Sequence, residues 1–178
     1  DLGPVDCLMV HWPVPGKHIA AYKALEEVVK AGKAKALGVS NYSPADYKEL
    51  MESASVAPDI NTFENNPALY RKEWVDFFQE QGVAVMAYKP LGRAGPILKS
   101  EVVAAIASRL GKSPAQVCLR WNTIKNNLVV FKSNTPSRID ENVDIFNFDL
   151  TPEDISALDS LTTDADREEA HGHWETRR

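Results

Sequence analysis

Short apolar runs alternate with longer amphipathic segments along this chain. The apolar runs are rich in β-branched residues and too short for helices, so they predict strands. They are apolar on both faces, which is typical of buried strands in a parallel sheet. Strands separated by helical segments indicate parallel pairing with helical crossovers. The five predicted strands are Cys7–Val10, Ala34–Val39, Ile60–Phe63, Val83–Ala87 and Leu128–Phe131.

Capping residues mark the predicted helices between and after these strands. Four helices begin at a serine or threonine followed by proline, which suits the N-cap and the first helical position. Three more helices are each followed by a glycine that stops them. A C-terminal tail is expected over residues 162–178. The N-cap residues are Ser43, Ser113, Thr135 and Thr151, and the glycine-stopped helices are residues 19–29, Trp74–Glu80 and Glu101–Leu110.

This arrangement favours an α/β fold of the TIM-type (β/α)8 barrel class. Each predicted strand is followed by polar or aromatic residues, and the active site of a β/α barrel lies at that end of its strands. A doubly wound sheet is the alternative, but it requires a glycine-rich turn, and the sequence contains no G-x-G-x-x-G. We therefore expect residues 1–178 to form a single, partial barrel domain of about five β/α units.

The strand count raises the question of what completes the sheet. A closed β/α barrel has about eight strands, and an open sheet leaves unpaired edge strands. We expect either that more chain precedes Asp1 and carries the N-terminal β/α units, or that a partner chain covers the open edge of the barrel.

Composition and charge narrow the possible partners. Hydrophobic residues make up 44% of the 178 residues, and the net charge of -5 argues against nucleic acid as the main partner. No apolar run approaches the roughly 20 residues of a membrane span, and no signal peptide is visible. Cys7 and Cys118 are expected to be buried free thiols, which favours a reducing, cytoplasmic location.

One segment has the features of a phosphate site. Lys132 directly follows the last predicted strand, and Arg138 lies in the first turn of the next helix. Ser133 and Thr135 supply hydroxyl groups between these two cations. The start of a helix offers unpaired N–H groups and a partial positive charge to an anion. The segment therefore predicts a local site for a phosphate monoester.

Four motifs occur in order along nearly the whole chain. They are Val10-His11-Trp12-Pro13, Ala36-Leu37-Gly38-Val39-Ser40-Asn41-Tyr42, Ala87-Tyr88-Lys89-Pro90-Leu91-Gly92, and the segment 132–142, Lys-Ser-Asn-Thr-Pro-Ser-Arg-Ile-Asp-Glu-Asn. In sequence, order and spacing they resemble the aldo-keto reductases, and the chain resembles the part of that family from about the fourth β/α unit onward. The resemblance implies a β/α barrel that binds NADPH and moves a hydride between nicotinamide and the carbonyl of an aldehyde or ketone.

The resemblance also implies roles for residues at the first strand ends. His11 matches the active-site histidine, where an imidazole can orient and polarise a carbonyl oxygen. Trp12 would line the substrate pocket. Ser40 and Asn41 match the pair that hydrogen-bonds the nicotinamide carboxamide. Without the resemblance, His11 could equally be a structural histidine, and Trp12 could be a core aromatic residue. Ser40 and Asn41 would then indicate only an ordinary turn.

Further positions match contacts with the rest of the cofactor. Tyr88 matches the tyrosine that stacks on the nicotinamide, and Leu91 lies where the chain passes the pyrophosphate. Lys132 and Arg138 match the residues that grip the adenosine 2′-phosphate, and two cations at one phosphate favour NADPH over NADH. Supporting contacts are implied for Ser133, Asn134 and Thr135, and adenine contacts for Glu141 and Asn142.

The chain also departs from the family pattern. Thr62 stands where a glutamine usually helps to hold the carboxamide, and its shorter side chain loses that contact or makes it through water. Lys89 replaces a common serine beside the pyrophosphate and could still pair with phosphate. Asn66 replaces a histidine that is expected to be structural, and Phe131 replaces a proline. The family's tyrosine acid would precede Asp1, so the chain as written lacks that proton donor and is expected to be inactive alone.

Three functional hypotheses follow. The first is the C-terminal part of an NADPH-dependent reductase of small-molecule carbonyl compounds. The second is a catalytically inactive, structural or NADPH-sensing subunit of a larger assembly. The third is a barrel enzyme for phosphorylated substrates, which leaves Ser40, Asn41 and Tyr88 unexplained. No metal is expected, because His171 and His173 lack a third ligand.

Overall fold

The computed structural model describes residues 3–92 and 95–176, apart from the side chain of His173. Five strands form one sheet in the order β1-β2-β3-β4-β5, which is also their order along the chain. The five predicted strands are confirmed to within two residues at each end. They are β1 (Val5–Val10), β2 (Ala34–Ser40), β3 (Ile60–Glu64), β4 (Ala84–Tyr88) and β5 (Leu128–Val130).

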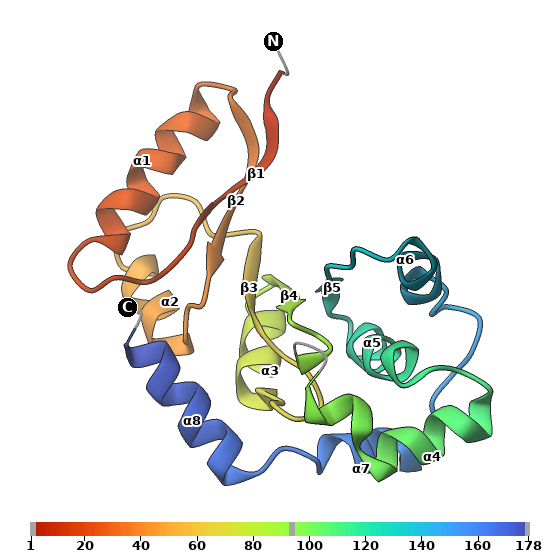
Figure 1. Ribbon diagram of the computed structural model, residues 1–178. Helices are drawn as coiled ribbons and strands as arrows, with labels where there is room; N and C mark the ends of the chain where they lie inside the picture. The colour runs from red at the N-terminus through yellow and green to blue at the C-terminus, as the bar shows by residue number, and fades with distance from the viewer. Residues whose placement is uncertain (1–2, 93–94, 177–178) are drawn as a thin grey trace. The chain divides into compact units, whose positions relative to one another are not determined.

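The register of the first three strands brings their carboxyl ends together. β1 pairs in parallel with β2, and Val10 lies opposite Val39. β2 pairs in parallel with β3, and Ser40 lies opposite Thr62. Helix α1 (His18–Lys30) packs against β1 and β2 (Figure 1). The polar residues that follow these strands therefore share one edge of the sheet, as expected for parallel strands.

All seven predicted helices are present. Two further helical segments are also present: η2, where no element was predicted, and α8, within the predicted C-terminal tail. The remaining helices are α2 (Pro44–Met51), α3 (Lys72–Glu80), η2 (Pro96–Lys99), α4 (Glu101–Leu110), α5 (Pro114–Ile124), α6 (Pro136–Val143), α7 (Pro152–Asp159) and α8 (Asp164–Glu175).

Three of the four predicted N-caps form reciprocal capping boxes. Ser43, Ser113 and Thr151 each accept a hydrogen bond from the backbone N–H three residues later. In each box, an aspartate or glutamine at that later position accepts the N–H of the cap in return. Thr135 is the N-cap of α6 and Pro136 its first helical residue, as predicted, but the Thr135 side chain makes no capping hydrogen bond. Its N3 residue is Arg138, which has no acceptor to complete such a box.

Contacts along the chain divide it into two compact units. The first unit has Tyr22, Leu37 and Val39 among its fully buried side chains, and the second has Trp121 and Leu158. The prediction of a single domain is not tested by this division and stays a prediction. The first unit comprises Asp1–Phe63, Lys72–Met86 and His171–Arg178, and the second comprises Glu64–Arg71 and Ala87–Ala170.

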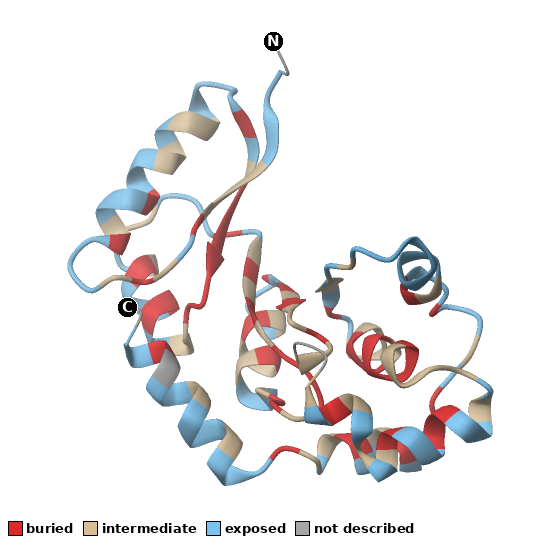
Figure 2. Cartoon of the chain, in the orientation of Figure 1, coloured by how far each residue is buried: buried red, intermediate tan, exposed pale blue. Residues whose placement is uncertain are grey.

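The outer strands are less buried than the sequence predicted. Leu128 and Val130 on β5 are each 49% exposed, and Val5 on β1 is 47% exposed. Figure 2 shows this contrast with the buried residues of β2. The reason is that β1 and β5 are the first and last strands of the sheet order, so each has one neighbouring strand within the described ranges.

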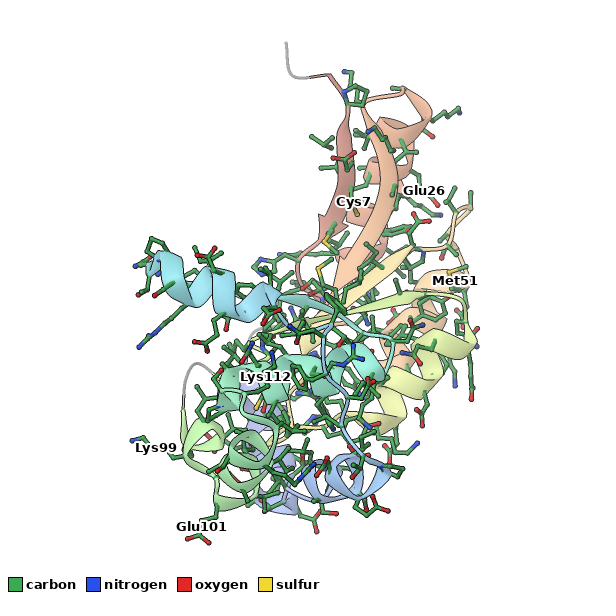
Figure 3. All side chains as sticks on the ribbon, turned by 90° about the vertical axis from the view of Figure 1, so that its right-hand side faces the viewer. Cys7, Glu26, Met51, Lys99, Glu101 and Lys112 are labelled. Carbon is green, nitrogen blue, oxygen red and sulfur yellow. The ribbon has the colours of Figure 1, made fainter. Side chains whose placement is uncertain are left out.

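The two cysteines are both free thiols, as expected. Cys118 on α5 is fully buried, and burial raises the pKa of its thiol to about 12. Cys7, labelled on β1 in Figure 3, is only partly buried, so that half of the prediction was wrong. The cause is again the outer position of β1. Within residues 3–92 and 95–176, no helix combines the length and apolar character needed to cross a membrane.

Candidate functional site

The predicted site residues fall into two groups, one in each unit. The first unit holds His11, Trp12, Ser40, Asn41 and Thr62, and the second holds Tyr88, Leu91, Lys132, Ser133, Asn134, Thr135, Arg138, Glu141 and Asn142.

Asn41 is the centre of the group in the first unit. Its side-chain amide donates to the carbonyl oxygen of His11 at 3.0 Å and to Oγ of Ser40 at 2.9 Å. Its backbone N–H donates to the carbonyl oxygen of Thr62 at 2.8 Å. The structure therefore brings four of the five predicted residues of this group together, with one asparagine joining the ends of β1, β2 and β3.

The backbone of Asn41 explains why this position holds an asparagine. Its φ is +64°, in the left-handed region, and the residue is buried. Asparagine is among the non-glycine residues that tolerate this region best. Glycine would fit the backbone but could not supply the two side-chain hydrogen bonds, so asparagine satisfies both demands.

His11 and Trp12 follow directly on β1. The His11 residue is exposed, and its ring centroid lies 6.0 Å from that of Trp12, which is partly buried. Because the backbone carbonyl of His11 is held by Asn41, the imidazole extends from a fixed point at the strand end.

Thr62 links two strands through its side chain. Its hydroxyl donates to the carbonyl oxygen of Met86 at 2.8 Å, so its hydrogen is used inside the sheet and its oxygen remains an acceptor. The neighbouring Asn61 is fully buried and donates to the carbonyl oxygen of Tyr42 at 2.9 Å. The Oδ1 atom of Asn61 has no hydrogen-bond partner in the described part of the chain. Nothing in the residue pattern distinguished Asn61 from an ordinary strand residue.

Trp174, in the predicted C-terminal tail, also belongs to this group. It lies on α8, is buried, and donates from Nε1 to the carbonyl oxygen of Asn41 at 2.6 Å. A threonine–aspartate cap, Thr163 with Asp166, precedes the helix and could have revealed it. The apolar periodicity could not, because α8 is almost entirely polar.

In the second unit, an ion pair lies beside Tyr88. Lys89 follows β4 with a left-handed φ of +46°, and its Nζ lies 5.2 Å from the centroid of the Tyr88 ring. The same ammonium pairs closely with Glu64 at the end of β3, and both side chains are about a quarter exposed, at 26% and 25%. Asn66 donates to the carbonyl oxygen of Lys89 at 3.2 Å, which supports the structural role expected for it.

Arg71 lies close to this ion pair. Burial lowers the pKa of Arg71, while the nearby Tyr88 and Glu64 act in the opposite direction. The end of β4 thus combines an aromatic ring, two cations and a carboxylate, and Leu91 follows on the same partly buried segment.

The segment between β5 and α6 has the exposed cations of the predicted phosphate site. Lys132 and Arg138 are both exposed. Ser133 rather than Thr135 makes the local turn, because its Oγ accepts the N–H of Thr135 at 3.1 Å. The carbonyl of Thr135 accepts the N–H of Arg138 at 3.0 Å, which fixes the first turn of α6 between the two cations. Asn134 is exposed in this turn.

The two predicted adenine contacts lie further along α6. Glu141 accepts a close hydrogen bond from the hydroxyl of Ser113, the N-cap of α5, and is partly buried. Asn142 is buried. The whole set from Lys132 to Asn142 is therefore carried by one short, continuous stretch of backbone.

A metal site is not evident. Within the described ranges, no three His, Cys, Asp or Glu residues are grouped so that they could hold a metal ion. The side chain of His173, which the sequence paired with His171, lies outside the described part of the structure.

Comparison with known proteins gives consistent matches. The sequence model of the aldo/keto reductase family matches residues 1–163. The uncharacterized oxidoreductase YtbE of Bacillus subtilis (strain 168) is 40% identical over 157 residues, which cover 88% of this chain and 56% of that protein. Glyoxal reductase of the same organism is 39% identical over 164 residues, covering 92% of this chain and 59% of that protein.

A solved structure agrees. The crystal structure of a Gox0644 variant in complex with NADPH matches with a TM-score of 0.87 and 32% identity, covering 92% of this chain and 61% of that chain. The chain thus spans between 56% and 61% of the length of these three relatives. The matches confirm the fold class as part of a β/α barrel and give no support to an inactive structural subunit. The chain belongs to the aldo-keto reductase family.

Proposed function

We propose that this chain carries the NADPH-binding residues and the active-site histidine of an oxidoreductase that reduces aldehydes or ketones to alcohols. The observation that supports it most is the pair of exposed cations, Lys132 and Arg138, on either side of the turn that starts α6. A 2′-phosphate would satisfy both, whereas a ribose hydroxyl would not. The NADPH complex of a related structure supports the same cofactor.

Hydrogen-bonding capacity supports the roles proposed for Ser40 and Asn41. Ser40 Oγ accepts from Asn41, so its own hydrogen can be donated to the carboxamide oxygen of the nicotinamide. The amide hydrogens of Asn41 are directed to His11 and Ser40, so its Oδ1 is the atom we assign to the carboxamide N–H. The two side chains therefore offer one donor and one acceptor to a group that needs both. Thr62 can offer only its oxygen, because its hydrogen is used on Met86.

The remaining contacts are proposed within the second unit. Tyr88 supplies a ring for stacking, and Leu91 and Lys89 lie on the segment assigned to the pyrophosphate. Ser133, Asn134 and Thr135 support the 2′-phosphate, and Glu141 and Asn142 contact the adenine.

The proposed reaction needs a hydride and a proton. When bound, NADPH supplies the hydride that adds to the carbonyl carbon, while the carbonyl oxygen takes up a proton. His11 orients the substrate by donating a hydrogen bond to that oxygen, and Trp12 lies beside it as a wall for the substrate.

We propose that neither Tyr22 nor Tyr42 is the proton donor for this reaction. Burial raises the pKa of both Tyr22 and Tyr42. The hydroxyl of Tyr22 donates to the carbonyl oxygen of Val56 at 3.0 Å, and that of Tyr42 lies 3.2 Å from Nδ1 of His18. Both phenols therefore have structural partners and are poor candidates for the acid.

A cytoplasmic location stays a prediction.

Turnover by the full-length protein tests this proposal. With a panel of small aldehydes and ketones that includes glyoxal, we expect NADPH consumption that matches alcohol formation. We expect His11→Ala to lower kcat/KM about 100-fold or more, because a hydrogen-bond donor aimed at the reacting oxygen contributes about that much. NADPH affinity should not change, since the histidine contacts the carbonyl. Unchanged kcat/KM in His11→Ala, or bound NADPH without turnover of any substrate, would contradict the proposal.

A further inference from the structure

The carbonyl oxygen of Asn41 is held from a part of the chain far away in sequence. Trp174 on α8 donates from its indole Nε1 to this oxygen at 2.6 Å, and the ring is only 7% exposed. A hydrogen bond of this length is at the short end for N–H···O contacts. One end of the C-terminal helix thus contacts the residue that joins the ends of β1, β2 and β3.

The indole is itself fixed by aromatic neighbours. His171, one helical turn earlier, stacks on it with ring centroids 5.7 Å apart and an interplanar angle of 22°. Trp74 of α3 meets it edge to face at 6.2 Å and also packs edge to face on Phe63 of β3 at 5.4 Å. These contacts all lie within the first unit. They hold the indole N–H in one direction, toward Asn41.

The conformation of Asn41 depends on this carbonyl. A residue at a φ of +64° is less favourable than one in the ordinary regions by roughly 1 kcal/mol or more for an L-amino acid. With its N–H held by Thr62, a change of φ at Asn41 would move its carbonyl away from the indole and would also move the side-chain amide that binds His11 and Ser40. A buried donor on the carbonyl opposes that rotation, because breaking the bond leaves both groups unsatisfied.

We propose that Trp174 is a positioning residue for the nicotinamide end of the cofactor site. Through its indole N–H it holds Asn41 in the left-handed conformation in which Asn41 Oδ1 and the Ser40 hydroxyl can meet the carboxamide. Trp174 does not itself contact the cofactor. This inference rests on the proposed function, because it assumes that Asn41 and Ser40 bind nicotinamide.

The test compares two ligands on the full-length protein. Trp174→Phe removes the N–H donor and keeps an aromatic ring, although a smaller one. NADPH contains the nicotinamide, whereas 2′,5′-ADP contains only the adenosine phosphates assigned to the second unit. We expect the variant to bind NADPH about threefold to tenfold more weakly, the range of one hydrogen bond, and to bind 2′,5′-ADP as the unmodified protein does. Fluorescence or calorimetric titration gives the Kd values for NADPH and for 2′,5′-ADP.

Trp121→Phe is the matched control. Its indole is buried in α5 and donates from Nε1 to Asp159 at 2.7 Å, so the substitution removes the same kind of bond at a place with no proposed cofactor contact. It should leave the ratio of the two affinities unchanged.

Each outcome has a distinct meaning. A selective loss of NADPH affinity in Trp174→Phe supports the inference. Unchanged affinity for both ligands, or an equal loss for both, would overturn it, since the role would then be absent or merely structural. If the unmodified protein bound NADPH no more tightly than 2′,5′-ADP, the proposed nicotinamide site would fail. If it bound neither ligand, the proposed function as a whole would fail.

Discussion

At the scale of single residues, Asn41 has several roles in the first unit. It combines a strained backbone with hydrogen bonds to His11, Ser40, Thr62 and Trp174. From the sequence, a serine and an asparagine after a strand indicated only a turn, and the family resemblance added a cofactor contact. The links between strand ends could not be predicted, because they join residues up to 133 positions apart in the sequence.

The two demands on Asn41 can be separated by substitution. Asn41→Gly removes the side-chain hydrogen bonds but relieves the backbone, whereas Asn41→Ala removes the bonds and keeps the strain. We expect Asn41→Gly to lower the free energy of unfolding by about 1–3 kcal/mol, and Asn41→Ala to lower it by roughly 1–2 kcal/mol more. Urea denaturation of the full-length protein measures the free energy of unfolding of each variant.

Asn126 provides the control for backbone strain. It has a similar φ of +59° but is exposed. Asn126→Gly should therefore be close to neutral, while Asn126→Ala should show the strain alone. Equal stability of Asn41→Gly and Asn41→Ala would show that the left-handed backbone carries no cost at that position.

At the scale of helices and strands, local chemistry made most elements predictable. Short, continuous apolar runs located the strands. Three serine or threonine caps with aspartate or glutamine at N3 located α2, α5 and α7. The predictions that failed depended on tertiary context. Helix α8 is polar and is held by the burial of one tryptophan, and the exposure of Leu128 and Val130 reflects the place of β5 in the sheet.

The N-terminal caps of α5 and α7 are predicted to differ in how their contributions to stability depend on pH. Burial would raise the pKa of Asp154 at N3 of α7, but hydrogen bonds from Arg109 and from the backbone N–H of Thr151 outweigh burial and lower it. A carboxylate whose pKa is lowered by folding stabilises the fold above its ordinary pKa, and this contribution is lost as the pH falls through the lowered value. Asp154→Asn should therefore cost about 1 kcal/mol near neutral pH and progressively less below about pH 4.

Gln116 gives the uncharged comparison for this prediction. It occupies the same N3 position in the box of α5 and accepts the N–H of Ser113 at 3.0 Å. The loss of melting temperature in Gln116→Ala should stay nearly constant between neutral and acid pH, whereas the loss in Asp154→Asn should shrink. A constant loss in both variants would mean that the charge of Asp154 adds nothing to its cap.

At the scale of the whole molecule, the sheet follows the chain order, and helices join strands that are neighbours in the sheet. The alternation of strands and helices, the polar strand ends and the absence of G-x-G-x-x-G together let the barrel class be predicted from the residue pattern. The cofactor was not predictable in that way, because the Lys132 segment by itself indicated only a phosphate. NADPH followed from the resemblance and is supported by a related structure that contains it.

The central claim is that Lys132 and Arg138 bind the 2′-phosphate of NADPH. The most direct test is a titration of the full-length protein with NADPH and with NADH. We predict that NADPH binds more tightly. We further predict that Lys132→Ala and Arg138→Ala each weaken NADPH binding by roughly tenfold to a hundredfold, as expected for hydrogen bonds to a charged group, with little effect on NADH. Equal affinity for the two cofactors, or equal losses for both in these variants, would contradict the account.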